Sequence, residues 1–222
     1  MEHSKESFAN PILQDLALLT LQSIVDSGKE AQLGLIQEID RIFRARPFLA
    51  QQKHINLLIG LYGATTSLSD RVILALLKLL ESTSTSSSIS QIGLRLLLGW
   101  GSKVSVNSAK VVDANVITEL IQTRFDGKLL LASISHYPLH TDFDAAAAAA
   151  SAVYDPEFVL HWLYFIVIEF KQHSLVDIQV LFESGLVAFV ICSLASYQDQ
   201  VRTLAFLLLE EIEKLVKVSE LS

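Results

Sequence analysis

The chain has 222 residues, of which 51% are hydrophobic and 18% are charged, and its formal net charge is −7. This composition excludes intrinsic disorder for most of the chain, and the length is sufficient for one large domain or two small ones. With 17 basic against 24 acidic residues, the balance is opposite to that of proteins that neutralise nucleic-acid phosphates.

Cysteine usage and hydropathy indicate the cellular environment. Cys192 is the single cysteine, so no disulfide forms within the chain and a reducing compartment is expected. Residues 1–10 are polar and lack the apolar core of a signal peptide. The most apolar run, residues 158–170, is shorter than the roughly 20 residues that a membrane span requires. The high hydropathy therefore predicts buried helices rather than a bilayer segment.

Helical spacing of apolar residues predicts the elements of the N-terminal part. The expected helices cover residues 10–28, 30–44 and 49–62, and a fourth runs from the Ser67 cap to residue 81. Asn10-Pro11 opens the first helix, Pro47 ends the second, and Ser67 with Asp70 three residues later is a capping signal. A Ser-rich linker follows at residues 82–90.

The middle of the chain carries weaker signals. We expect a short helix at residues 91–98, a loop at 102–110, and a helix at 114–124 that Gly127 closes. Residues 128–136 are Leu-rich, and their pattern leaves helix and strand open. Residues 138–153 contain six consecutive alanines and are predicted to be a connector.

The C-terminal part has the clearest helix signals. Asp155-Pro156-Glu157 is a cap followed by proline at the first helical position, and it opens a helix that is apolar nearly all round. Further helices are expected from Ser174 to residue 183, at 186–195 after the break at Ser184-Gly185, and at 199–217. The last helix carries two acid-first pairs four residues apart, Glu210 with Lys214 and Glu213 with Lys217.

The sequence predicts an all-α fold, an irregular armadillo/HEAT-like stack of helix pairs (an α-solenoid). Asp199-x-Val201-Arg202-x-x-Ala205-x-x-x-Leu209 resembles the second half of armadillo and HEAT repeats, in which an acid caps the helix, an arginine braces the turn and a small residue permits close approach. No fixed period recurs along the chain, so the stack is irregular. The expected divisions are a helical block at 1–81, the linker 82–90, a helical block at 91–137, the connector 138–153 and an armadillo-like block at 154–222. One continuous solenoid is the alternative arrangement.

Side chains with reactive chemistry are few, and none forms a recognisable catalytic, metal or cofactor pattern. Cys192 has apolar neighbours, which raise the pKa of a thiol, so a buried structural cysteine is expected. His136 and His140 are four residues apart, but Pro138 interrupts any helix between them. Asp142 and Asp144 are too few ligands for an oxygen-only metal site. We therefore expect no enzyme, cofactor or metal.

Four residues are candidates for partner contact: Trp100, Arg41, Arg44 and Arg46. Trp100 lies between two glycines and is expected to be more exposed than Trp162, whose neighbours are apolar. The arginines belong to a basic stretch that continues through Lys53 and His54, and RNA binding would rest on that stretch alone. The simpler interpretation of the stretch is a solvated helix end, where cations suit the helix dipole.

Several short motifs, in order, resemble a known family. They are Leu61-Tyr62-Gly63-Ala64-Thr65-Thr66-Ser67-Leu68-Ser69-Asp70, Gly99-Trp100-Gly101, His136-Tyr137-Pro138, Tyr154-Asp155-Pro156-Glu157-Phe158, Glu183-Ser184-Gly185-Leu186 and Leu194-Ala195-Ser196-Tyr197. Together, over about residues 57–216, they resemble the C-terminal region of the nucleolar pre-ribosomal-associated protein 1 family. The chain is far shorter than members of that family, so a fragment, an isolated domain or a truncated gene model is expected.

The resemblance implies a function that composition does not show. It implies a non-enzymatic scaffold in the nucleolus for early large (60S) ribosomal subunit assembly and pre-rRNA processing. The implied partners are other ribosome-assembly proteins, including a helicase, and through them pre-ribosomal particles, with no membrane and no small-molecule substrate. The alternative is a cytoplasmic armadillo-like adaptor unrelated to ribosomes, which the helical pattern accommodates equally well.

Overall fold

The computed structural model describes residues 29–83, 93, 96–97, 100, 121–122, 124–137, 153–169 and 175–219. The helix expected at 10–28, most of the Ser-rich linker, the loop at 102–110 and the alanine run lie outside these residues. The chain divides into two compact units, Met1–Gly63 with Ser67–Asn107 (unit 1) and Ala64–Thr66 with Ser108–Ser222 (unit 2). The described elements of both units are helices, which confirms the all-α prediction.

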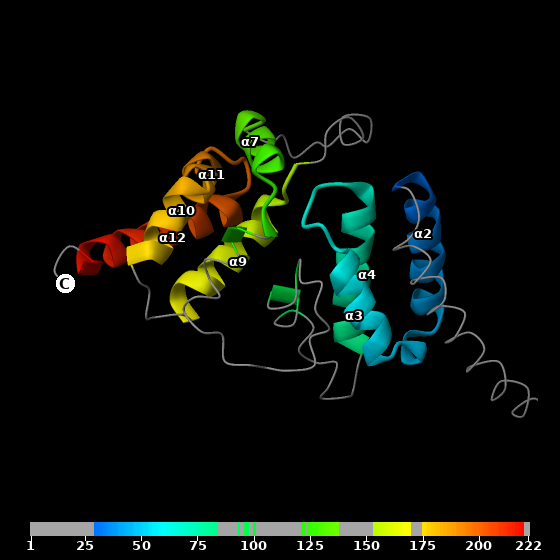
Figure 1. Cartoon of the computed structure of the whole chain (residues 1–222). Coiled ribbons are helices and arrows are strands. Elements are labelled where there is room, and N and C mark those ends of the chain that lie inside the picture. Colours follow the sequence, from blue (N-terminus) through cyan, green and yellow to red (C-terminus); the bar gives the residue numbers. More distant parts are fainter. Residues whose placement is uncertain are drawn as a thin grey trace, which may run out of the picture. The chain divides into compact units, whose positions relative to one another are not determined.

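Unit 1 is built from α2 (Lys29–Ala45), the 3-10 helix η1 (Pro47–Leu49), α3 (Gln52–Leu61) and α4 (Leu68–Thr83) (Figure 1). The α2 and α4 helices pack along each other and enclose most of the core. Its fully buried side chains include Ile39, Phe43, Ile55, Leu58, Ile73 and Leu76. They recur every three or four residues along each helix, which is why these segments fold as amphipathic helices.

The start of α3 differs from the prediction. A helix was expected from residue 49, but Pro47–Leu49 forms a separate 3-10 turn and α3 begins at Gln52. Gln51 is the N-cap of α3, and its backbone N–H donates to Nδ1 of His54 at 2.9 Å, so the helix begins three residues later than expected. His54 is fully buried and its ring meets that of Phe43 edge-on at 5.4 Å.

The predicted cap of α4 is confirmed. Ser67 Oγ accepts a hydrogen bond from the backbone N–H of Asp70 at 3.2 Å. The Asp70 carboxylate also accepts from the backbone N–H of Gly63 at 2.9 Å, so it closes the turn before the helix. A Cβ on Gly63 would lie 3.0 Å from that carboxylate, so a side chain at this position would require the Asp70 carboxylate to shift by a few tenths of an ångström.

Unit 2 contains α7 (Gly127–Ser135), α9 (Pro156–Glu169), α10 (Leu175–Glu183), α11 (Leu186–Ser193) and α12 (Asp199–Ser219), which lie together in Figure 1. The α12 helix packs along α9, and α11 contacts α7, α10 and α12. Fully buried side chains at the centre include Leu160, Trp162, Leu186, Phe189, Ala205 and Leu208. The apolar α9 helix lies inside the unit, as its pattern predicted, and seven of its side chains are buried: Phe158, Val159, Leu160, Trp162, Leu163, Ile166 and Val167.

The end expected for the helix at 114–124 is found, because Arg124 is helical and Phe125 and Asp126 are not. The prediction that Gly127 closes that helix is wrong, since Gly127 belongs to the next one. Asp126 is the N-cap of a new helix, α7, because its carboxylate accepts from the backbone N–H groups of Lys128 at 2.8 Å and Leu129 at 3.2 Å. Gly127 is therefore the first residue of α7. The Leu-rich segment whose type was open is this helix.

The signals in the last seventy residues are largely confirmed. Asp155 accepts from the backbone N–H of Glu157 at 3.0 Å and caps α9, and Gly185 breaks the chain between α10 and α11 with φ of +83°. On α12, Glu213 pairs with Lys217 at 2.6 Å as predicted. Lys214 pairs at 2.6 Å with Glu211, three residues before it, instead of with Glu210.

A short extended contact joins two distant parts of the sequence within unit 2. The backbone N–H of Thr66 donates to the carbonyl of Val153, and that of Asp155 donates to the carbonyl of Ala64, both at 2.8 Å. These bonds form an isolated antiparallel bridge between Thr65 and Tyr154. Ala64 holds a left-handed conformation with φ of +56°, which costs a residue with a Cβ about 1 kcal/mol.

Candidate partner-binding surface

Trp100 does not offer the exposed surface that was expected of it. Its side chain is 2% exposed, and its backbone N–H donates to the carbonyl of Leu96 at 2.9 Å. The flanking glycines suggested an open turn, but a large indole ring gains more by burial than any other side chain. Trp162, expected in the core, is fully buried.

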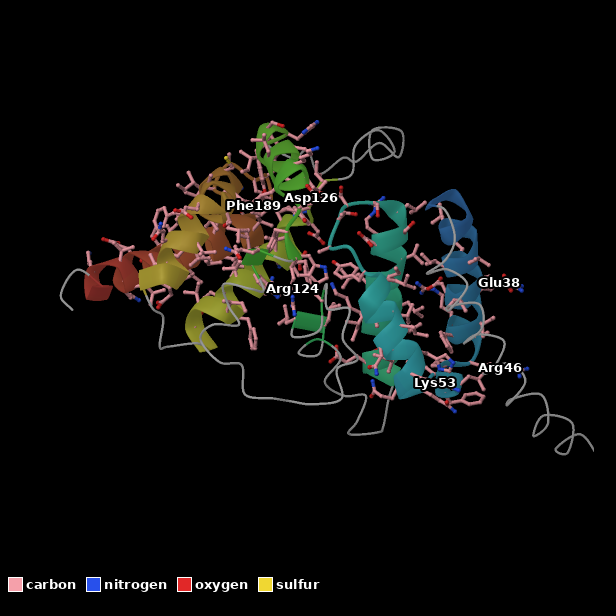
Figure 2. The ribbon with its side chains drawn as sticks, in the orientation of Figure 1. Glu38, Arg46, Lys53, Arg124, Asp126 and Phe189 are labelled. Carbon is pink, nitrogen blue, oxygen red and sulfur yellow. The ribbon has the colours of Figure 1, made fainter. Side chains whose placement is uncertain are left out.

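The predicted basic cluster is largely balanced by acids on the same helix. Arg41 pairs with Glu38 and Arg44 pairs with Asp40, each at 2.7 Å, on the outer side of α2. Those contacts raise the pKa of both arginines through hydrogen bonding to the carboxylates and their Coulomb attraction. Figure 2 shows Arg46 and Lys53 at the same end of unit 1, with Glu38 farther along α2. The arrangement is that of a solvated helix face.

An arginine that the sequence did not single out lies against the core of unit 2. The Arg124 guanidinium lies 5.9 Å from the centre of the Trp162 ring, and partial burial lowers its pKa to about 10. The neighbouring Phe125 meets the rings of Trp162 and Tyr154 edge-on, at 5.4 Å each. A cation over an indole face stabilises the packing here. At neutral pH the guanidinium remains charged.

Two tyrosines of the family-like motifs tie the helices of unit 2 together. Tyr154 Oη accepts from the backbone N–H of Asp126, and the backbone N–H of Tyr154 donates to Ser133 Oγ, both at 2.8 Å. Tyr137 Oη lies 3.0 Å from Ser193 Oγ, and burial raises the pKa of Tyr137 to about 12. These residues hold α7, α9 and α11 in place, so the motifs mark structural positions.

Cys192 is half-buried, whereas a fully buried cysteine was expected. It lies on α11, a helix of eight residues whose sequence is apolar apart from Ser193. A helix with apolar residues on every side cannot turn all of them inward, so some of them remain at the surface. The prediction followed the neighbours in sequence, and helix geometry separates those neighbours onto different faces.

The outward side of α11 and the turn after it form an uncharged apolar surface, which we call the α11 face. It comprises Ala188, Ile191, Cys192, Leu194, Ala195 and Tyr197. Ile191 is 53% exposed, Leu194 38% and Tyr197 55%. No charged residue occurs in the sequence between Glu183 and Asp199. Adjacent exposed apolar side chains of this kind mark protein-contact sites more often than isolated ones do.

The turn between α11 and α12 has the bracing expected from armadillo-like repeats. Arg202 donates from Nη1 to the carbonyl of Ser196 at 2.6 Å and also pairs with Asp199. Ala205, at the position where close approach was expected, is fully buried. The α11 face is therefore held on a fixed turn.

Among the described residues, no group of three or more His, Cys, Asp or Glu side chains could hold a metal ion. None of the described helices is long and apolar enough to cross a bilayer.

The chain is similar in sequence to a known mouse protein. The chain is 26% identical to the nucleolar pre-ribosomal-associated protein 1 of Mus musculus over 205 residues, which cover 83% of this chain. The chain spans 8% of the length of that relative. No family model matches the chain, and no solved structure matches it.

Proposed function

We propose that this chain is a non-enzymatic helical scaffold that acts in ribosome assembly through contacts with other proteins. The observation that carries the proposal is the similarity to the mouse nucleolar pre-ribosomal-associated protein 1 across 83% of the chain. We extend the proposal to the nucleolus, to early large (60S) subunit precursors and to partners that include a helicase, as the family resemblance implies.

The structure supports the resemblance at the residues that suggested it. The motif around residues 61–70 and the one around 154–158 are far apart in sequence, yet Ala64–Thr66 and residues 153–155 form one bridge. Two other motifs also have structural roles in unit 2. Tyr137 contacts Ser193 through its hydroxyl group, and Gly185 forms the turn between α10 and α11. Shared motifs that fix turns favour a shared fold, and the ribosomal role then rests on the similarity itself.

The proposal is tested by following the full chain in cells. A tagged chain is expressed, nuclear extract is separated on a density gradient, and the bound proteins and precursor RNA are identified. We expect co-sedimentation with large-subunit precursors and retention of the assembly proteins after RNase treatment. Complete absence of the chain from precursor fractions overturns the ribosomal role.

A cytoplasmic adaptor is the second candidate, and the braced turn favours it equally. The contacts of Arg202 with Ser196 and Asp199 fit an armadillo-like repeat whatever its partner. A fluorescent fusion distinguishes the two functions, because the first requires nucleolar signal and the second requires signal in the cytoplasm alone.

A further inference from the structure

We infer that the α11 face binds an amphipathic helix with basic flanks from a partner protein. The inference deepens the proposed scaffold function and rests on it for the premise that the chain acts through protein contacts. It adds a surface and a chemical class of partner that the similarity to the mouse protein does not supply.

The shape of the α11 face suits a helix. Ala188 lies three and four residues before Ile191 and Cys192, so these three residues form a short ridge on the outer side of α11. Ala195 follows in the turn after the helix. Such ridges pack into the grooves between side chains of another helix. Ala188 leaves room for that helix to approach closely, and Ile191 is the one large side chain in the ridge.

The charge of unit 2 selects the chemistry of the partner. The sequence of unit 2 contains 15 acidic and seven basic residues, whereas that of unit 1 contains nine acidic and ten basic. The net negative charge of the chain therefore comes from the unit that carries the uncharged α11 face. A basic helix is attracted to this unit and is then held by apolar contact.

A second copy of the chain is a poorer fit for the same surface. Each copy carries a formal net charge of −7, so two copies repel as their acidic units approach. A partner with an apolar stripe and Lys or Arg beside it avoids that repulsion. It also supplies a cation that Glu183, at the start of the uncharged stretch, attracts.

The test uses the full chain and three synthetic probes of about five helical turns. The first is an amphipathic Leu/Lys helix, the second a matched Leu/Glu helix, and the third has the Leu/Lys composition in an order without an apolar stripe. Binding is measured by calorimetry at about 0.15 M salt, where long-range attraction is screened. We expect the Leu/Lys helix to bind at least about tenfold more tightly than either control.

Substitution then locates the binding surface. Ile191→Ser removes exposed apolar area without adding charge, and we expect it to weaken the Leu/Lys helix about tenfold. Phe48→Ser is the matched control, because Phe48 is 70% exposed and belongs to unit 1. It should leave the affinity unchanged. Circular dichroism of both variants verifies that each remains folded.

Three results would overturn the inference. The first is equal binding of the ordered and disordered Leu/Lys probes, and the second is equal affinity of the Ile191→Ser variant and the original chain. The third is a dimer in light scattering that Ile191→Ser abolishes, which would assign the face to a second copy. Failure here leaves precursor co-sedimentation unaffected, and failure of co-sedimentation leaves probe binding unaffected, so the two proposals fall separately.

Discussion

The outer sides of α2 and α11 differ in the kind of side chain that they expose. On α2, Glu38 and Arg41 form an exposed ion pair, and Arg44 pairs with Asp40 beside it. On α11 the corresponding side carries Ala188, Ile191 and Cys192 and no charge. The outer side of α2 is charged and suited to water, whereas the outer side of α11 exposes apolar area. Charge pattern distinguishes the two better than hydropathy does.

The largest effect should come from emptying the core of either unit. Trp162→Ala removes a fully buried ring and should cost about 3–5 kcal/mol of unfolding free energy. Phe43→Ala is the counterpart in unit 1. Hydrogen exchange can be measured peptide by peptide. Trp162→Ala should speed exchange in α9, α11 and α12, and Phe43→Ala should speed it in α2 and α4. Equal acceleration in both units after one substitution would mean that they unfold together.

The next largest effect on stability should come from replacing Gly185, the residue before α11, where the backbone conformation favours glycine. Gly185→Ala forces a residue with a Cβ to hold φ of +83° and should cost about 1–2 kcal/mol. The added carbon would lie 3.6 Å from Leu130, an ordinary contact, so the cost is conformational. Gly34→Ala on α2 is the control, and its effect should have the opposite sign. A Cβ at this position meets no atom within 4 Å, so the free energy of unfolding should rise by about 0.5–1 kcal/mol. Urea denaturation measures both, and a gain at position 185 would contradict the left-handed turn.

A smaller and pH-dependent effect is expected at Tyr137. Burial raises its folded pKa to about 12, above the usual value near 10, so the folded state holds this proton more tightly than the unfolded state. Its contribution to stability is complete below about pH 10 and is lost as the pH rises toward about 12. Tyr137→Phe should therefore reduce the alkaline loss of stability, measured by urea denaturation at several pH values. An unchanged alkaline slope would show that the phenol is not buried beside Ser193.

The smallest effect is expected on the outer side of α2. Glu38→Gln breaks an exposed ion pair with Arg41, and such pairs contribute little in water. The denaturation midpoint should not move measurably, with or without added salt. A clear destabilisation that salt abolishes would show that the surface of α2 depends on its charges more than we infer.

The helices were predictable where a local signal marks their ends. Asp155 before Pro156, Ser67 before Asp70 and the left-handed Gly185 all act within a few residues of the sequence position that suggested them. The start of α7 was missed because Gly127 was interpreted as the residue that follows a helix, where glycine is common. Glycine is also tolerated at the start of a helix, and the preceding Asp126, which caps α7, was the signal for that alternative.

The candidate surface was harder to predict than the helices. Trp100 and Cys192 were assigned from their neighbours in sequence, but burial is decided by the direction in which each side chain leaves its element. For α11 the available signal was the uncharged stretch itself, because a helix of eight residues cannot bury apolar side chains on every side. The bridge between Thr65 and Tyr154 has no local signal at all.

That bridge has a consequence for any attempt to divide the chain. Ala64–Thr66 belongs to unit 2, although the residues on both sides of it belong to unit 1. Thr66 also bonds the carbonyl of Val153 across 87 positions in sequence, so unit 2 closes by a long-range event and should fold after its local helices form. A fragment that starts after residue 66 would leave the Asp155 amide without its Ala64 acceptor. A C-terminal fragment that begins at Ala64 keeps both hydrogen bonds of the bridge, but it also carries Ser67–Asn107 without the rest of unit 1. A single cut in the chain therefore cannot separate the two units cleanly.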